Sequence, residues 1–237
     1  MLGCRLFQGR YLAHAQVVGA PALTPARLSC LRLLGVLSQP DVSFEDIEEL
    51  VRLEPALAVR VLTVANSAAV GARREIVSVR DALVMLGLSQ LRGWLQLMVF
   101  TDVAGSSSEL FSSALVRARA CELLAGGRPG LSSDTAFTTG LVSSLDLLLG
   151  QPIEWIVARM GLGNDLHFAL TTGDGPLGEL LDAVRRYEQG GEPPEYHGYD
   201  SADLAQAFLA GVEWSRQGEL AAVTGAADQQ PRHRQPQ

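Results

Sequence analysis

The sequence predicts an all-α protein, an irregular bundle of about ten short helices between residues 24 and 217. Two observations support this fold class. Apolar residues recur at the helical spacing i, i+3, i+4, i+7 along most of the chain, and helix-start signals precede many of these segments. Alternating runs of β-branched residues are absent after residue 20, and no heptad persists, so neither a sheet nor a coiled coil is expected.

The helical spacing marks the faces that we expect to be buried. These faces are Cys30, Leu33, Leu34 and Leu37; Ala58, Val61, Leu62 and Ala65; Leu91, Trp94, Leu95 and Met98; Phe111, Ala114, Leu115 and Ala118; Leu177, Leu180, Leu181 and Val184; and Ala205, Phe208, Leu209 and Val212.

Start and stop signals divide these segments. Thr24 before Pro25 is typical of a helix N-terminus, because proline suits the first helical position. A hydroxyl residue stands three positions before an acid at Ser43, Ser78 and Ser106, as in a capping box. Breaks are predicted at Pro40, Gly71, Gly87, 126–130 and 190–194.

Composition excludes several classes of function. The chain has 237 residues, 47% of them hydrophobic, and a net charge of −7, which argues against nucleic-acid binding. All 19 cationic residues are arginines, so a lysine nucleophile or a phosphate-loop lysine is excluded. Cys4, Cys30 and Cys121 include no C-x-x-C pair, and we expect reduced, buried thiols rather than disulfides or a zinc site.

Neither the N-terminus nor the longest apolar stretch has the pattern of a targeting or membrane segment. The N-terminal 14 residues contain no uninterrupted apolar run, so no signal peptide is predicted. Residues 83–100 include Ser89, Gln90, Arg92 and Gln96, which do not suit a membrane span. The sequence therefore predicts a soluble, cytoplasmic protein that does not insert into a membrane.

Candidate catalytic groups are sparse. The four histidines, at positions 14, 167, 197 and 233, form no pair at i+3 or i+4, so no helix presents a two-histidine metal face. Asp146 lies beside the apolar positions Val142 and Leu149, and a carboxylate there needs a partner. We expect a capping bond or an arginine partner, and the alternative is an acid that faces a ligand.

Two long segments resemble an HDOD domain. They are PALAVRVLTVANSAAVG at 55–71 and REIVSVRDALVMLGLSQLRGWLQL at 74–97, supported by SALVRARACELLA at 113–125 and GLVSSLDLLLG at 140–150. HDOD domains are all-helical relatives of the HD-domain phosphohydrolases. The resemblance implies an HD-like multi-helix bundle over residues 22–217.

The two ends of the chain are expected to differ from this bundle. GCRLFQGRYLA at 3–13 resembles the closing strand of an EAL domain, the barrel that hydrolyses cyclic di-GMP, so residues 1–20 are interpreted as a non-helical EAL remnant. Residues 218–237 end in DQQPRHRQPQ and are expected to form a disordered tail.

The resemblance also bears on catalysis. The His-Asp dyad that holds the metal in an HD phosphohydrolase would fall on Ser143 and Ser144, and no histidine lies near Ser113, where another ligand is expected. Serine hydroxyls do not replace those ligands. We therefore expect no catalytic residue, no metal, no cofactor and no enzyme activity.

The leading prediction is a non-catalytic bacterial signalling module that acts by protein–protein interaction and is linked to cyclic di-GMP. Its partner would be a signalling protein, an EAL domain or a second copy of the chain, and Arg73, Arg74 and Trp94 are candidate contact residues. Two alternatives remain: a metal-dependent phosphohydrolase that uses Asp146, Asp165 and His167, or cyclic-dinucleotide binding without turnover.

Overall fold

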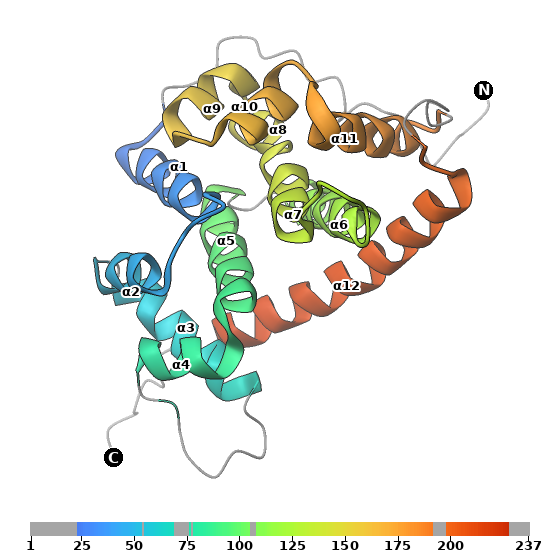
Figure 1. Ribbon diagram of the computed structural model, residues 1–237. Coiled ribbons are helices and arrows are strands. Elements are labelled where there is room, and N and C mark those ends of the chain that lie inside the picture. The colour runs from blue at the N-terminus through green and yellow to red at the C-terminus, as the bar shows by residue number, and fades with distance from the viewer. Residues whose placement is uncertain are drawn as a thin grey trace, which may run out of the picture.

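The fold is all-helical, as the periodicity predicted (Figure 1). The computed structural model describes residues 23–53, 55–68, 76, 78–104, 108–191 and 198–227, and these residues form helices without a strand. The helices are α1 (Pro25–Leu37), α2 (Phe44–Leu53), α3 (Pro55–Ala68), α4 (Val79–Leu86), α5 (Leu88–Ala104), α6 (Ser108–Ala125), α7 (Ser133–Val142), α8 (Leu145–Leu149), α9 (Ile153–Met160), α10 (Asn164–Thr171), α11 (Gly175–Glu188) and α12 (Ser201–Ala227).

Local capping starts several helices where the sequence predicted. The Thr24 hydroxyl accepts a hydrogen bond from the Arg27 amide at 3.3 Å. Ser43 and Asp46 form a reciprocal pair, in which each main-chain amide donates to the other side chain at 2.8 and 3.2 Å. The hydroxyl and amide of Ser43 lower the pKa of the Asp46 carboxyl. These bonds satisfy amides that the first helical turn leaves without a partner.

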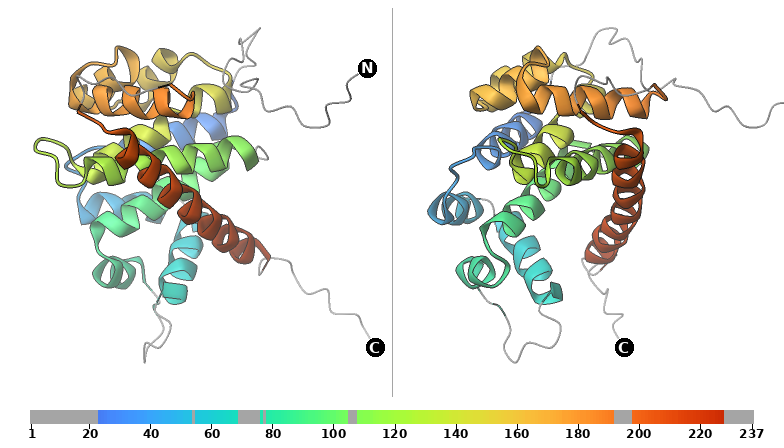
Figure 2. Two further views of the ribbon diagram at one scale, coloured as in Figure 1. Left: turned by 90° about the vertical axis from the view of Figure 1, so that its right-hand side faces the viewer. Right: turned by 45° about the vertical axis from the view of Figure 1, so that its right-hand side comes forward.

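The helices gather in two groups joined by a middle layer (Figures 1 and 2). Helices α2, α3 and α4 lie at one end of the molecule, and α9, α10 and α11 lie at the other. The helices α1, α5, α6 and α7 occupy the space between them. One continuous hydrophobic cluster runs through these elements.

Helices α6 and α7 approach each other closely at Gly140. A Cβ atom at this position would lie 2.7 Å from Ala118 Cα and 2.9 Å from the Arg117 carbonyl oxygen. Real Cβ atoms do not come so near to backbone, so glycine is required for this helix contact. The contact places the end of α7 directly against the middle of α6.

Helix α12 also packs on α6, but with a face that the sequence analysis did not predict. Leu209 and Val212 were expected inside, and they are 72% and 47% exposed. The buried positions are Leu204, Ala207, Gly211 and Ser215. A Cβ at Gly211 would lie 2.9 Å from the Val116 carbonyl oxygen, so the small residues face α6 because the two backbones come close there.

The ends of the chain bear on two further expectations. Helix α12 continues to Ala227, beyond the boundary predicted at residue 217, through an alanine-rich stretch without proline. The EAL-like segment at 1–20 and residues 228–237 lie outside the described residues.

Among the described helices, none is long and apolar enough to cross a membrane without another. Helices α4 and α5 reach that length and hydropathy only as a pair, and a bend of 118° separates them.

Candidate functional site

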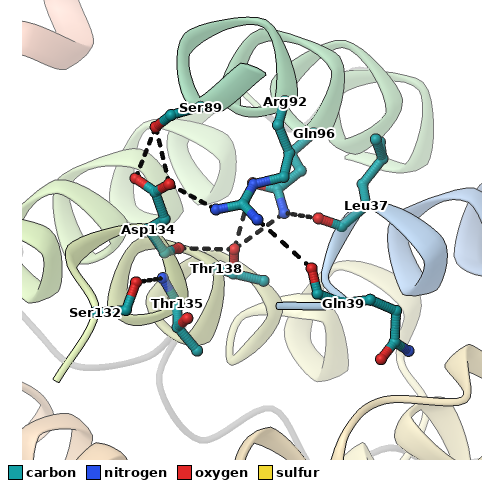
Figure 3. A network of polar contacts seen from close by, with 9 residues as sticks. All are labelled: Leu37, Gln39, Ser89, Arg92, Gln96, Ser132, Asp134, Thr135 and Thr138. Carbon is teal, nitrogen blue, oxygen red and sulfur yellow. Dashed lines mark hydrogen bonds and ion pairs between the residues drawn. The ribbon is translucent and has the colours of Figure 1, made fainter. Parts of the chain in front are cut away.

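Helix α7 lies in the middle layer, and polar side chains hold it at both ends. At its N-terminal end, Asp134 in the first turn accepts a hydrogen bond from Arg92 of α5 at 2.6 Å (Figure 3). The Ser89 hydroxyl lies 2.9 and 2.8 Å from the two carboxylate oxygens of the same residue. An acid in this turn also suits the positive end of the helix dipole. This cluster joins α5 to α7.

A buried amide extends the same network to α1. The Gln96 side chain is 2% exposed, and its Nε2 donates to the Leu37 carbonyl and to the Thr138 hydroxyl oxygen, both at 3.0 Å (Figure 3). The Thr138 hydroxyl donates in turn to the Asp134 carbonyl at 2.9 Å. Three helices are thus joined by bonds that no water can replace without opening the core.

The C-terminal end of α7 holds the two serines that the resemblance assigns to the dyad. Ser143 and Ser144 are 1% and 4% exposed. Both hydroxyl oxygens lie against Nη1 of Arg117, which comes from α6, at 3.1 and 2.9 Å. The Ser143 hydroxyl donates its own proton to the Gly140 carbonyl at 2.7 Å.

The Arg117 guanidinium forms a bidentate ion pair with the carboxylate of Glu188 at the end of α11. Its Nε lies 3.0 Å from each carboxylate oxygen, and Nη2 lies 2.7 Å from one of them. Burial is the largest single influence and lowers the pKa of Arg117, but the charge and hydrogen bonds of Glu188, with smaller contributions from other groups that include Asp146, together raise this pKa above its ordinary value. Arg117 is therefore permanently charged.

A second cation, Arg185 of α11, reaches the same place. Its Nη2 donates to the Ser143 carbonyl at 3.0 Å. Burial, and then the charge of Arg117, lower the pKa of Arg185. Two guanidinium groups thus lie at the carboxyl end of α7, where the helix dipole favours positive charge.

Asp146 and Cys121 complete the surroundings of these arginines. Asp146 is half-buried in the first turn of α8, and its Oδ1 accepts from the Leu147 amide at 2.8 Å. Its charge also acts on both Arg117 and Arg185. The Cys121 thiol is fully buried, and burial raises its pKa to about 12. Cys30 is half-buried and not in a disulfide, and Cys4 lies outside the described residues.

A divalent metal does not fit this site. The atoms at the dyad positions are two hydroxyl oxygens that already face a guanidinium, where metal sites of this type need imidazole and carboxylate. Throughout the described chain, no three His, Cys, Asp or Glu side chains are grouped to hold a metal ion. Asp146, Asp165 and His167 are therefore not brought together, and Asp165 instead lines a cavity of about 200 Å³ with Phe168 and Asp174.

Of the three predicted contact residues, the structure describes only Trp94. Arg73 and Arg74 lie outside the described residues. Of the described residues nearby, Ile76 is bound to α3: Asn66 Oδ1 accepts from the Ile76 amide at 2.8 Å, and Asn66 Nδ2 donates to the Ile76 carbonyl at 2.9 Å. Trp94 is half-buried on α5 and is not a member of the core.

Sequence analysis did not single out Arg117, Arg185 or Glu188. A signal for Arg117 exists, because it lies on the buried face of α6 at i+3 from Ala114 and i−4 from Cys121. A charge inside an apolar stripe demands a buried partner. The identity of that partner, 71 residues further along the chain, carries no local signal.

The chain is similar to a known domain family and to two curated proteins. A family model of the HDOD domain matches residues 24–150. The chain is 30% identical over 221 residues to the cyclic di-GMP phosphodiesterase CdgJ of Vibrio cholerae serotype O1, and 25% identical over 219 residues to the uncharacterized protein YuxH of Bacillus subtilis strain 168. Each alignment covers 90% of this chain, but 51% and 54% of the relative, so the chain spans about half their length.

A solved structure is similar in fold. It is a protein from Marinobacter aquaeolei VT8, described as a candidate signal-transduction protein. It aligns with 93% of this chain and 66% of its own chain, at 18% identity and a TM-score of 0.55. This similarity concerns the fold alone.

The comparison with CdgJ contradicts one prediction. The absence of enzyme activity was predicted from Ser143 and Ser144, but a relative that aligns with 90% of this chain is named a phosphodiesterase. The prediction was wrong because the two serines bear only on a metal at their own positions. They do not bear on hydrolysis carried out elsewhere in a protein.

Proposed function

Because this chain belongs to the HDOD domain family, we propose that it is a signalling domain that works in cyclic di-GMP hydrolysis, as part of a phosphodiesterase of that nucleotide. The observation that carries this proposal is the 30% identity to CdgJ over 221 residues. The likeness of residues 3–13 to the end of an EAL barrel supports the same link. Hydrolysis would not use Ser143 and Ser144, whose hydroxyls are bound to Arg117.

The contribution of the bundle to this activity would be contact with protein. Three large apolar side chains support the proposal, because Leu53, Val84 and Leu209 are each more than 70% exposed. Leu53 at the end of α2 and Val84 on α4 belong to helices that pack against each other, and exposed apolar side chains on neighbouring helices favour contact with another protein surface. The partner proposed is a domain or protein that hydrolyses cyclic di-GMP.

The link to cyclic di-GMP is tested in the source bacterium. We expect disruption of the gene to raise cellular cyclic di-GMP, measured by mass spectrometry, because a component of its hydrolysis is lost. A plasmid copy of the gene should restore the level. An unchanged level after disruption would refute the proposed function.

The contact is tested with the same complementation. Val84→Glu places a charge on an exposed apolar position of α4, so we expect it to fold normally and to fail to restore the cyclic di-GMP level. Gln90→Glu adds the same charge at an exposed polar position of α5 and should complement fully. Complementation by Val84→Glu would exclude contact through this part of α4.

A further inference from the structure

Oxygen acceptors surround Arg117 as they would surround a bound metal ion. Here the positive group is a side chain of the protein itself. The hydroxyls of the neighbouring residues Ser143 and Ser144 and the carboxylate of the distant Glu188 converge with their oxygens on one guanidinium. Because the Ser143 hydroxyl gives its proton to the Gly140 carbonyl, its lone pairs are directed to Arg117. The arrangement is a set of acceptors around a single positive group.

The charges of the site are balanced without a metal. Arg117 and Arg185 bring two positive charges, and Glu188 and Asp146 bring two negative charges, so the four groups sum to zero. The side chains of Arg117 and Glu188 are only 10% and 19% exposed. A divalent ion here would add two uncompensated positive charges in a place that water hardly reaches, which is unfavourable.

We propose that the Arg117 guanidinium occupies the position that the metal ion takes in HD phosphohydrolases. Its positive charge serves as the cation of this site and prevents divalent ions from binding there. The guanidinium joins α6 to the carboxyl end of α7 and to the last turn of α11. It therefore links these three helices as a metal ion bound between them would. This inference rests on the contacts of Arg117 and not on the proposed function.

The first experiment asks whether the wild-type protein binds a divalent metal. Purified protein is titrated with Mn²⁺, and free Mn²⁺ is followed by its electron paramagnetic resonance signal. We expect no stoichiometric binding, and we expect Tm to be unchanged by Mn²⁺ or by EDTA. Stoichiometric Mn²⁺ binding that is lost in the Ser143→Ala/Ser144→Ala variant would overturn the proposal.

The second experiment asks whether the charge of Arg117 is needed. Arg117→Met leaves the Glu188 carboxylate poorly solvated and without its partner, so we expect Tm to fall by roughly 5–10 °C. The double variant Arg117→Met/Glu188→Met should recover at least half of this loss, because it removes both charges.

The matched control is Arg186→Met, on the same helix as Glu188. Arg186 pairs with Asp182 at 2.8 Å, and its side chain is 52% exposed, so we expect Tm to change by less than about 2 °C. A loss for Arg117→Met no larger than that for Arg186→Met would refute the role of Arg117 as a structural cation. A double variant less stable than Arg117→Met would refute it as well.

Discussion

Replacing Gly140 by alanine tests the close approach of α6 and α7, on which the position of Ser143 and Ser144 depends. The added Cβ would lie 2.7 Å from Ala118 Cα, whereas carbon atoms in ordinary contact are about 3.5–4.0 Å apart. The helices would have to separate by roughly 1 Å, and such overpacking costs about 1–3 kcal/mol. Because the obstacle is backbone, no side-chain rotation can relieve it.

A second glycine provides the control for this substitution. Gly93 is also inside a helix, α5, but a Cβ there would meet no atom within 4 Å. Gly93→Ala should therefore stabilise the protein by about 0.5–1 kcal/mol, through the helix preference of alanine alone.

Urea unfolding followed by circular dichroism measures both changes, and thermal unfolding checks them. For a chain of this size we expect Tm to fall by roughly 3–10 °C in Gly140→Ala and to rise by roughly 1–4 °C in Gly93→Ala. If Gly140→Ala were as stable as the wild type, or if both variants changed in the same direction, the proposed close packing of α6 on α7 would be wrong.

Three other predictions concern burial and charge. Gln96→Leu removes the hydrogen-bond donor of the Leu37 carbonyl at the end of α1, so we expect the free energy of unfolding in urea to fall by about 1–3 kcal/mol. Gln90 is exposed, and Gln90→Leu should change this free energy by less than about 0.5 kcal/mol. Equal effects of the two substitutions would contradict the hydrogen-bond network of Gln96. Burial raises the pKa of Cys121 to about 12, so its thiol should not react with iodoacetamide at pH 8 in the folded protein and should react after unfolding. Mass spectrometry locates the alkylated cysteine, and alkylation of Cys121 in the folded protein would contradict its burial. Asp46, whose pKa is lowered by Ser43, stabilises the fold above its ordinary pKa of 3.8, and this contribution is lost as the pH falls through the lowered value. Asp46→Asn should therefore destabilise the protein at pH 7 and have a smaller effect at pH 2, and an effect that does not depend on pH would argue against a role for the carboxylate's charge.

Capping and the buried face of α11 show where sequence patterns are sufficient. The Ser43 and Asp46 pair acts across three residues, so the sequence alone contains both partners and their spacing. Leu177, Leu180, Leu181 and Val184 are all buried as predicted, since α11 is polar on its other side and has one apolar stripe to bury.

Helix α12 shows where the same pattern fails. Its larger apolar residues, Leu209 and Val212, form a stripe by spacing, but the backbone of α6 lies too near for large side chains. The face with Gly211 is buried instead. Periodicity measures how apolar each face is, and it contains no information about how close the neighbouring helix comes.

The candidate site divides in the same way. Residues that are near one another in the chain predict the all-helical fold class, the helix starts and the segment around Ser143. They do so because the hydrogen bonds and side-chain contacts within one helical turn join residues only a few positions apart. The meeting of Arg117 with Glu188 across 71 positions, and of Arg92 with Asp134 across 42, depends on how the helices pack. A charge buried by packing must take whichever partner the fold brings to it, and that choice is made by the three-dimensional arrangement of α5, α6, α7 and α11.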